Sequence, residues 1–149
     1  MSTEIEFEQH VVIPQRSGPE VFDYVSDFSR AAEWRVEVTE STMSPPGPMR
    51  LGTRLGEVAR VAGRKVVTES VVDQFAPPDS WTFAHIRGPL PVSGGFRVEP
   101  GDGEVRLTYR LQVHLGGAWA VAAPYLRWSG RRMIRKSLAR LAERLATLG

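Results

Sequence analysis

The chain has 149 residues, of which 42% are hydrophobic and 24% charged, with no cysteine and a net charge of +2. This length and composition predict one globular domain with a sizeable core and argue against a disordered chain. The missing cysteines exclude disulfides, zinc–thiolate sites, iron–sulfur clusters and thiol nucleophiles.

The first predicted element is a strand over residues 5–13, in which apolar and polar side chains alternate. A helix should follow, because Ser17 can cap its first turn and Pro19 fits the start of a helix. Apolar residues recur at helical spacing over residues 21–28, and a second short helix is expected to carry Trp34.

Strand-like runs separated by proline and glycine turns make up the middle of the chain. We expect six further strands, at residues 36–43, 53–61, 64–75, 80–87, 92–99 and 104–115. The last is the clearest, because six apolar residues alternate with six polar ones. In the run 64–75 valines occupy both even and odd positions, so a regular strand would point them to both faces of the sheet. This pattern predicts a β-bulge. Short turns between neighbouring strands predict antiparallel pairing.

A long helix is expected from Ala118 to about Ala146, with Pro124 either kinking it or marking its true first turn. A single apolar stripe runs along its second half. Only this helix is long enough to cover the dry face of seven strands. We therefore predict an α+β fold, a seven-stranded curved antiparallel sheet wrapped around the C-terminal helix, with two short helices between the first and second strands.

Several segments carry a likeness to a known superfamily. They are Val21-Phe22-Asp23-Tyr24-Val25-Ser26-Asp27-Phe28 followed by Trp34, Gly52-Thr53 opening a strand, Phe75-Ala76-Pro77-Pro78 before Trp81-Thr82-Phe83, and the long helix. With these features the chain resembles the helix-grip SRPBCC superfamily of START-like domains, and within it the polyketide cyclase/dehydrase and lipid-transport group. The likeness covers nearly all of residues 1–149 and implies a single domain with a ligand cavity. It implies no universal catalytic motif.

The long helix itself suggests where a cavity lies. Its second half carries Leu138, Leu141 and Leu145, whereas the stripe continues backwards through the light residue Gly130 to Leu126. Glycine inside a helix costs about 1 kcal/mol relative to alanine, so it calls for a reason. We expect unfilled volume under the first half of the helix, and the alternative is a close approach between helix and sheet at Gly130.

Inward-facing strand residues and the start of the helix supply the expected cavity lining. We predict ligand contacts from Trp34, Leu55, Trp81, Phe83, Phe96, Leu111, Trp119, Tyr125, Leu126, Trp128, Gly130 and Met133. Such a surface suits a small hydrophobic ligand, for example a lipid, an isoprenoid or a polyketide-like molecule. The alternative is that the aromatic residues simply fill the core.

Three polar residues with an inward phase are candidates for chemistry in the cavity. Glu57 and His85 could transfer protons and Tyr109 could position a carbonyl, as a cyclase, aromatase or dehydrase would require. The alternatives are core residues with satisfied hydrogen bonds, Glu57 being paired with an arginine such as Arg54 or Arg87. No cofactor is expected, and with only three histidines no metal site is expected either.

Charge is distributed unevenly along the chain. Residues 118–149 contain seven basic residues and one acidic residue, a net +6, whereas the remainder has 12 basic and 16 acidic residues, a net −4. A solvated helix face is the ordinary explanation, and docking to a membrane surface or an acidic partner is the alternative. Nucleic acid is not expected, since no aromatic platform accompanies the basic stripe. Without a targeting or membrane-spanning segment, we expect a cytoplasmic protein, a monomer or a homodimer.

Overall fold

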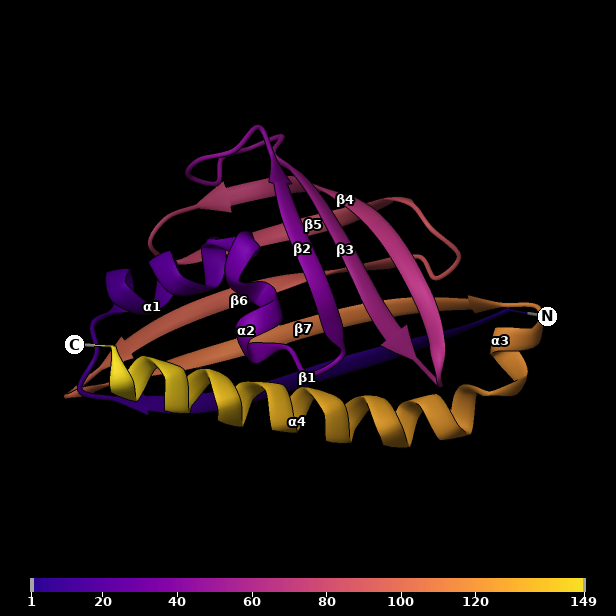
Figure 1. The fold of residues 1–149 in the computed structure, drawn as a ribbon. Helices are drawn as coiled ribbons and strands as arrows, with labels where there is room; N and C mark the ends of the chain where they lie inside the picture. The colour runs from indigo at the N-terminus through magenta and orange to yellow at the C-terminus, as the bar shows by residue number, and fades with distance from the viewer. Residues whose placement is uncertain (1, 149) are drawn as a thin grey trace.

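The computed structural model describes residues 2–148, and its main feature is one antiparallel sheet in the order β1-β7-β6-β5-β4-β3-β2. The sheet bends over the long helix α4, which lies along its concave side (Figure 1). The strands are β1 (Ser2–Pro14), β2 (Val38–Ser44), β3 (Arg54–Val61), β4 (Arg64–Ala76), β5 (Ser80–Arg87), β6 (Val92–Gly101) and β7 (Glu104–Gly116).

The helices occupy the predicted places in the chain order. Between β1 and β2 lie α1 (Gly18–Ser26), a single 3-10 turn (Phe28–Arg30) and α2 (Ala31–Trp34). After β7 come α3 (Ala118–Val121) and α4 (Ala123–Thr147). This arrangement confirms the predicted helix-grip fold. No helix among residues 2–148 combines the length and apolar character needed to cross a membrane.

Helix α1 starts where local chemistry satisfies its free backbone groups. The Ser17 hydroxyl accepts a hydrogen bond from the Glu20 amide, and the Glu20 carboxylate accepts one from the Ser17 amide. This capping box fixes the first turn and the direction in which the chain leaves β1.

The pairing of β1 with β7 joins the two ends of the strand sequence. Their register runs from Ser2 opposite Gly116 to Pro14 opposite Glu104 without a break. On β7 the apolar residues Val105, Leu107 and Leu115 are fully buried, as their alternation predicted. These residues and the buried stripe of α4 belong to one core, so the core lies between the concave face of the sheet and α4.

The middle of the sheet is less regular. The β4–β5 ladder shifts register between Glu69 and Ser70 and again between Val72 and Gln74, which confirms the bulge predicted for this strand. Strands β5 and β6 pair only from Ser80 to Phe83, where Phe83 lies opposite Gly94. A side chain at Gly94 would collide with the backbone of β7, so only glycine permits this close approach.

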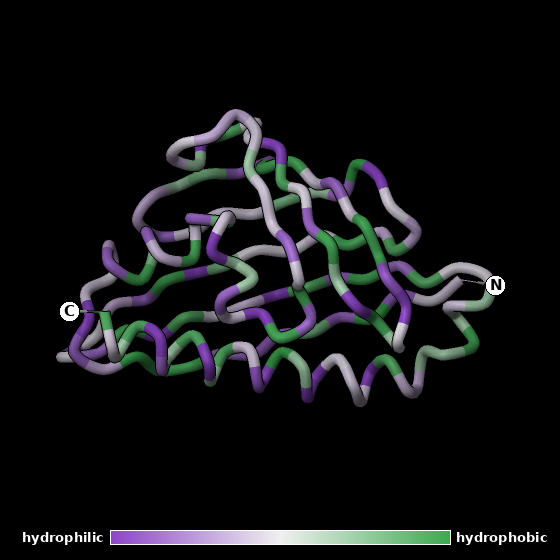
Figure 2. The backbone as a smooth tube through the Cα atoms, viewed as in Figure 1, coloured by the Kyte–Doolittle hydropathy of each residue, from purple (hydrophilic) through white to green (hydrophobic). Residues whose placement is uncertain are grey.

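Helix α4 differs in detail from the predicted single helix. Ala118–Val121 forms a separate turn of helix, and Pro124 lies in the first turn of α4, the second of the two predicted alternatives. The tube in Figure 2 shows α4 alternating between hydrophobic and hydrophilic residues along its length. Its buried stripe includes Ile134, Leu138, Leu141 and Leu145, which close one end of the interior.

Candidate functional site

An apolar cavity of about 290 Å³ lies under the first half of α4. Tyr125, Leu126, Ser129, Gly130 and Met133 of the helix form its roof. The sheet contributes Ile5, Phe7, Glu57, Ala59, Arg60, Val61, Val66, Thr68, Val92, Leu111, Val113 and Leu115, and the connections add Arg35, Glu37, Ala62 and Leu90. The volume falls near the lower end of the range for ligand sites, roughly 300–1,000 Å³.

Gly130 has a structural reason to be glycine. A Cβ atom built on it would lie 2.6 Å from Cζ and 2.8 Å from Cε1 of Phe7. The missing side chain therefore admits the ring of β1 against the helix, and the cavity begins beside that contact. Both predicted alternatives for Gly130, the close approach and the unfilled volume, occur together.

A cluster of three charged side chains forms the polar part of the cavity wall. Nη1 of Arg35 donates to Oε1 of Glu57 at 3.0 Å, and Nη2 donates to Oε2 of Glu57 at 3.1 Å. Nη2 also donates to Oε2 of Glu37 at 3.3 Å. The three side chains are only 10%, 15% and 8% exposed, in the order Arg35, Glu57, Glu37. We call this set the Arg35 cluster.

The backbone holds the Arg35 cluster against α4. Strand β2 begins at Val38, two residues later than the sequence pattern predicted, so residues 35–37 form a lead-in that does not follow strand alternation. Within it the Val36 amide donates to the buried Ser137 hydroxyl of α4 at 3.1 Å. As a result Val36 is turned outward, while the charged residues on either side of it point inward.

The Arg35 cluster contains one positive and two negative side chains. Burial by itself would lower the pKa of Arg35, but the neighbouring Glu57, with Tyr109 and Glu37, raises it well above its usual value. Arg35 therefore stays charged. Two polar atoms of the cluster, Nε of Arg35 and Oε1 of Glu37, are buried and have no hydrogen-bond partner among residues 2–148. Buried polar atoms without partners are rare in folded proteins, and these two belong to side chains that line the cavity.

Only some of the predicted ligand contacts lie in the cavity wall. Leu111, Tyr125, Leu126, Gly130 and Met133 line it. Leu55 is buried in the core, and Trp119 packs against the edge of that core. Trp128 is 59% exposed on the outer face of α4.

The remaining predicted aromatic contacts pack on one another. Phe96 stacks on Tyr109 with 4.5 Å between ring centroids and 3° between planes. Trp34 packs edge-on against both rings, and Trp81 contacts Phe96 and Phe83. None of these five residues lines the cavity under α4, and Phe83 and Phe96 instead border a hollow on the opposite face of the sheet.

The three candidate residues for chemistry do not meet at one point of the cavity. Glu57 lies in the wall, but both of its oxygens accept hydrogen bonds from Arg35, not from Arg54 or Arg87. His85 and Tyr109 are outside the wall, and Nδ1 of His85 is buried without a partner among residues 2–148. Burial raises the pKa of Tyr109, so its hydroxyl remains protonated.

Sequence reasoning missed Arg35 and Glu37, the two members of the Arg35 cluster other than Glu57. The run 36–43 resembles a regular strand, and its alternation does not reveal that its first residues belong to a connection. The available signal was Glu57: a carboxylate with an inward phase requires a cation. The two arginines expected for that role, Arg54 and Arg87, lie near Glu69 instead, with N–O distances of 3.5 and 3.9 Å.

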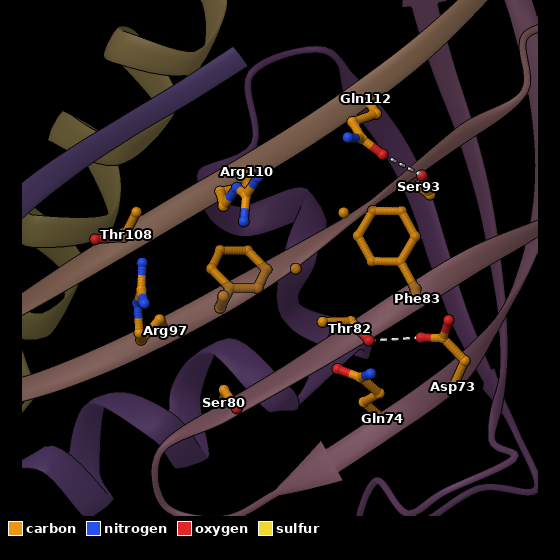
Figure 3. Close-up of a pocket in the computed structure, with 13 residues that line it drawn as sticks. Asp73, Gln74, Ser80, Thr82, Phe83, Ser93, Arg97, Thr108, Arg110 and Gln112 are labelled. Atoms are coloured by element: carbon orange, nitrogen blue, oxygen red, sulfur yellow. Dashed lines mark hydrogen bonds between the residues drawn. The ribbon is translucent and has the colours of Figure 1, made fainter. Parts of the chain in front are cut away.

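A second hollow lies on the sheet face turned away from α4 (Figure 3). Its rim is polar, and its side chains interact with each other: the Thr82 hydroxyl donates to Asp73 at 2.5 Å, and the Ser93 hydroxyl donates to Gln112 at 3.5 Å. Phe83 and Phe96 also line this hollow, but most of its lining residues are polar. The cavity under α4 has a mainly apolar lining, so it is the candidate ligand site. Within residues 2–148 no three His, Asp or Glu side chains are placed to hold a metal ion.

Solved structures with the same fold are numerous. A START superfamily protein from Mycobacterium smegmatis has a TM-score of 0.79 at 17% identity, with 97% of this chain and 99% of that chain covered. The protein TTHA0849 from Thermus thermophilus has a TM-score of 0.82 at 17% identity, covering 95% and 97%. The Zhui aromatase/cyclase from Streptomyces sp. R1128 has a TM-score of 0.81 at 14% identity, covering 97% and 94%. No curated protein matches the sequence significantly.

The pairing of the strands around α4, with a cavity under the first half of the helix, defines a helix-grip domain. Residues 4–146 match the family model described as polyketide cyclase / dehydrase and lipid transport. The chain belongs to this family, which confirms the resemblance drawn from its sequence.

Proposed function

We propose that this protein binds a small hydrophobic molecule in the cavity under α4, and that the molecule places a hydroxyl group at the Arg35 cluster. A lipid, an isoprenoid or a polyketide-like compound of modest size fits the volume of about 290 Å³. The observation that carries the proposal is an apolar cavity with one buried, incompletely hydrogen-bonded polar cluster in its wall.

The chemistry of the cluster selects the polar group of the ligand. A hydroxyl can accept a hydrogen bond from Nε of Arg35 and donate one to Oε1 of Glu37. A carboxylate can only accept, and it would add a third negative charge beside Glu37 and Glu57. The cluster therefore favours an alcohol over a fatty acid of the same length.

A proton-transferring enzyme has less support in this geometry. Glu57 is held by Arg35 through both oxygens, and His85 and Tyr109 do not reach the cavity wall. General acid–base catalysis needs its groups within hydrogen-bond reach of one substrate. Binding or carriage of the ligand is therefore the function that we propose.

Displacement of a hydrophobic dye by matched compounds tests this function. We expect a straight-chain alcohol to bind about tenfold more tightly than the alkane or the carboxylic acid of equal length, since one buried hydrogen bond contributes about 1 kcal/mol or slightly more. Glu37→Gln should reduce that preference, whereas Glu40→Gln, at an exposed position on β2, should leave it unchanged. Absence of any binding would contradict the ligand site. Equal affinity for alcohol and alkane would contradict only the hydroxyl contact.

A further inference from the structure

The outer surface of α3 and the first half of α4 exposes large apolar side chains. Val121 is 80% exposed, Trp128 59% and Tyr125 54%. Tyr125 and Trp128 lie side by side, with 6.3 Å between their ring centroids. Adjacent exposed aromatic residues on one short stretch of helix indicate a contact surface, because single exposed apolar residues are common but clusters are not.

Four arginines border these apolar residues. Arg127, Arg131, Arg132 and Arg135 are exposed and, with Pro124 and Trp128, surround a shallow hollow in the surface. The guanidinium carbon of Arg132 lies 5.6 Å from the centre of the Trp128 ring. Within residues 2–148 none of the four forms an ion pair with a carboxylate. We call these arginines, together with Val121, Tyr125 and Trp128, the α3–α4 patch.

The charge of the molecule is concentrated on the side that carries the patch. All seven basic residues after residue 117 are exposed on α4, and their one acidic neighbour in that segment is Glu143. The rest of the chain carries a net −4. On the outward face of β1, Glu8 pairs with Arg110 and Glu6 accepts a hydrogen bond from Gln112, and neither carboxylate forms an ion pair with an arginine of the patch.

The patch adjoins the ligand cavity. Tyr125 belongs to both, since it is half exposed on the helix and also lines the cavity roof. A hydrophobic molecule that left a bilayer at this position would lie next to the cavity roof. The shared residue links the patch to the cavity, and a basic helix face that was only solvated would not need such a link.

We propose that the α3–α4 patch docks on an anionic lipid surface. Trp128, Tyr125 and Val121 enter the headgroup region, and the arginines bind the lipid phosphates. An acidic protein would match the charge equally well. The lipid surface is favoured because aromatic and aliphatic side chains stand exposed among the arginines, which is the composition of an interfacial helix.

Sedimentation with vesicles tests the docking surface directly. We expect the wild-type protein to bind vesicles of phosphatidylcholine and phosphatidylglycerol at low salt, and to bind phosphatidylcholine vesicles much more weakly. Arg132→Gln combined with Arg135→Gln should reduce binding about 25-fold, because each charge near an anionic surface changes binding about fivefold. Trp128→Ala should reduce it several-fold, and circular dichroism should show both variants folded, since these side chains are exposed.

A matched double variant distinguishes the loss of the patch from a general loss of positive charge. Arg50→Gln with Arg106→Gln removes the same charge at exposed positions outside α4 and should leave vesicle binding nearly unchanged. Equal losses from both doubles would overturn the patch as the docking site. Failure of the wild-type protein to bind anionic vesicles would overturn lipid docking altogether, and retention by an immobilised acidic protein in that case would identify the other partner class. The assay needs no cavity ligand, so it stands apart from the test of ligand binding.

Discussion

The two ends of the space between α4 and the sheet share one helix and one apolar stripe, yet within residues 2–148 the ligand cavity lies at one end and leucines fill the other. At the C-terminal end of the helix, close to α1 (Figure 1), the fully buried Leu141 and Leu145 fill the interior. At the other end the stripe passes through Gly130, and a charged cluster occupies part of the wall. The difference shows that leucines fill the interior at one end, whereas a glycine and a charged cluster leave volume unfilled at the other.

Among these variants, removal of the Arg35 guanidinium at the cavity end should lower the stability of the protein most. Arg35→Met leaves two buried carboxylates facing each other, so we expect the free energy of unfolding to fall by about 5 kcal/mol, measured by denaturant titration. Arg54→Met removes an exposed ion pair with Glu69 and should cost less than about 1 kcal/mol. Similar losses for the two variants would show that the Arg35 cluster does not anchor this end.

The same leucine-to-alanine change at each end measures the contrast in packing. Leu141→Ala empties a fully buried position at the filled end and should cost about 4 kcal/mol of unfolding free energy. Leu126→Ala acts on a side chain that already borders the cavity, so fewer contacts are lost and we expect about 2 kcal/mol. If calorimetry gave equal costs, the two ends would be packed alike.

Gly130→Ala should have the smallest effect on stability and a clear effect on the ligand. The new methyl group would push the Phe7 ring toward the cavity, and the gain in helix propensity would offset part of the strain, leaving a net loss of about 1 kcal/mol. Ligand affinity, measured by dye displacement, should fall because the cavity becomes smaller. Ala139→Gly, at an exposed position of the same helix, should cost about 1 kcal/mol without changing affinity. Unchanged affinity in Gly130→Ala would place the ligand elsewhere.

The sequence predicted the fold well because its signals are local and periodic. The alternation along β7 identifies the buried face of the sheet, and the stripe from Ile134 to Leu145 identifies the buried face of α4. Each pattern is strong enough that tertiary contacts do not override it. The capping residues at Ser17 and the proline in the first turn of α4 likewise mark helix starts through backbone chemistry alone.

The candidate site was harder to predict, because a cavity is a balance of volumes between distant segments. An inward aromatic residue such as Phe96 can line a pocket or fill the core, and alternation is identical in both cases. Arg35 and Glu57 are 22 residues apart, and nothing in the spacing of either indicates that they pair. Leu126 and Met133 were found because the light position Gly130 lies between them on the helix.

The pairing of β1 with β7 has a consequence for how the protein is made. Strand β1 cannot pair fully with β7 until the ribosome has released more than one hundred further residues, because Ser2 lies opposite Gly116. Helix α4 emerges later still, so the concave face of the sheet remains uncovered until residues 123–147 have been made. Contacts so distant in sequence also slow folding, which makes the newly made chain most vulnerable to aggregation just before α4 reaches its place.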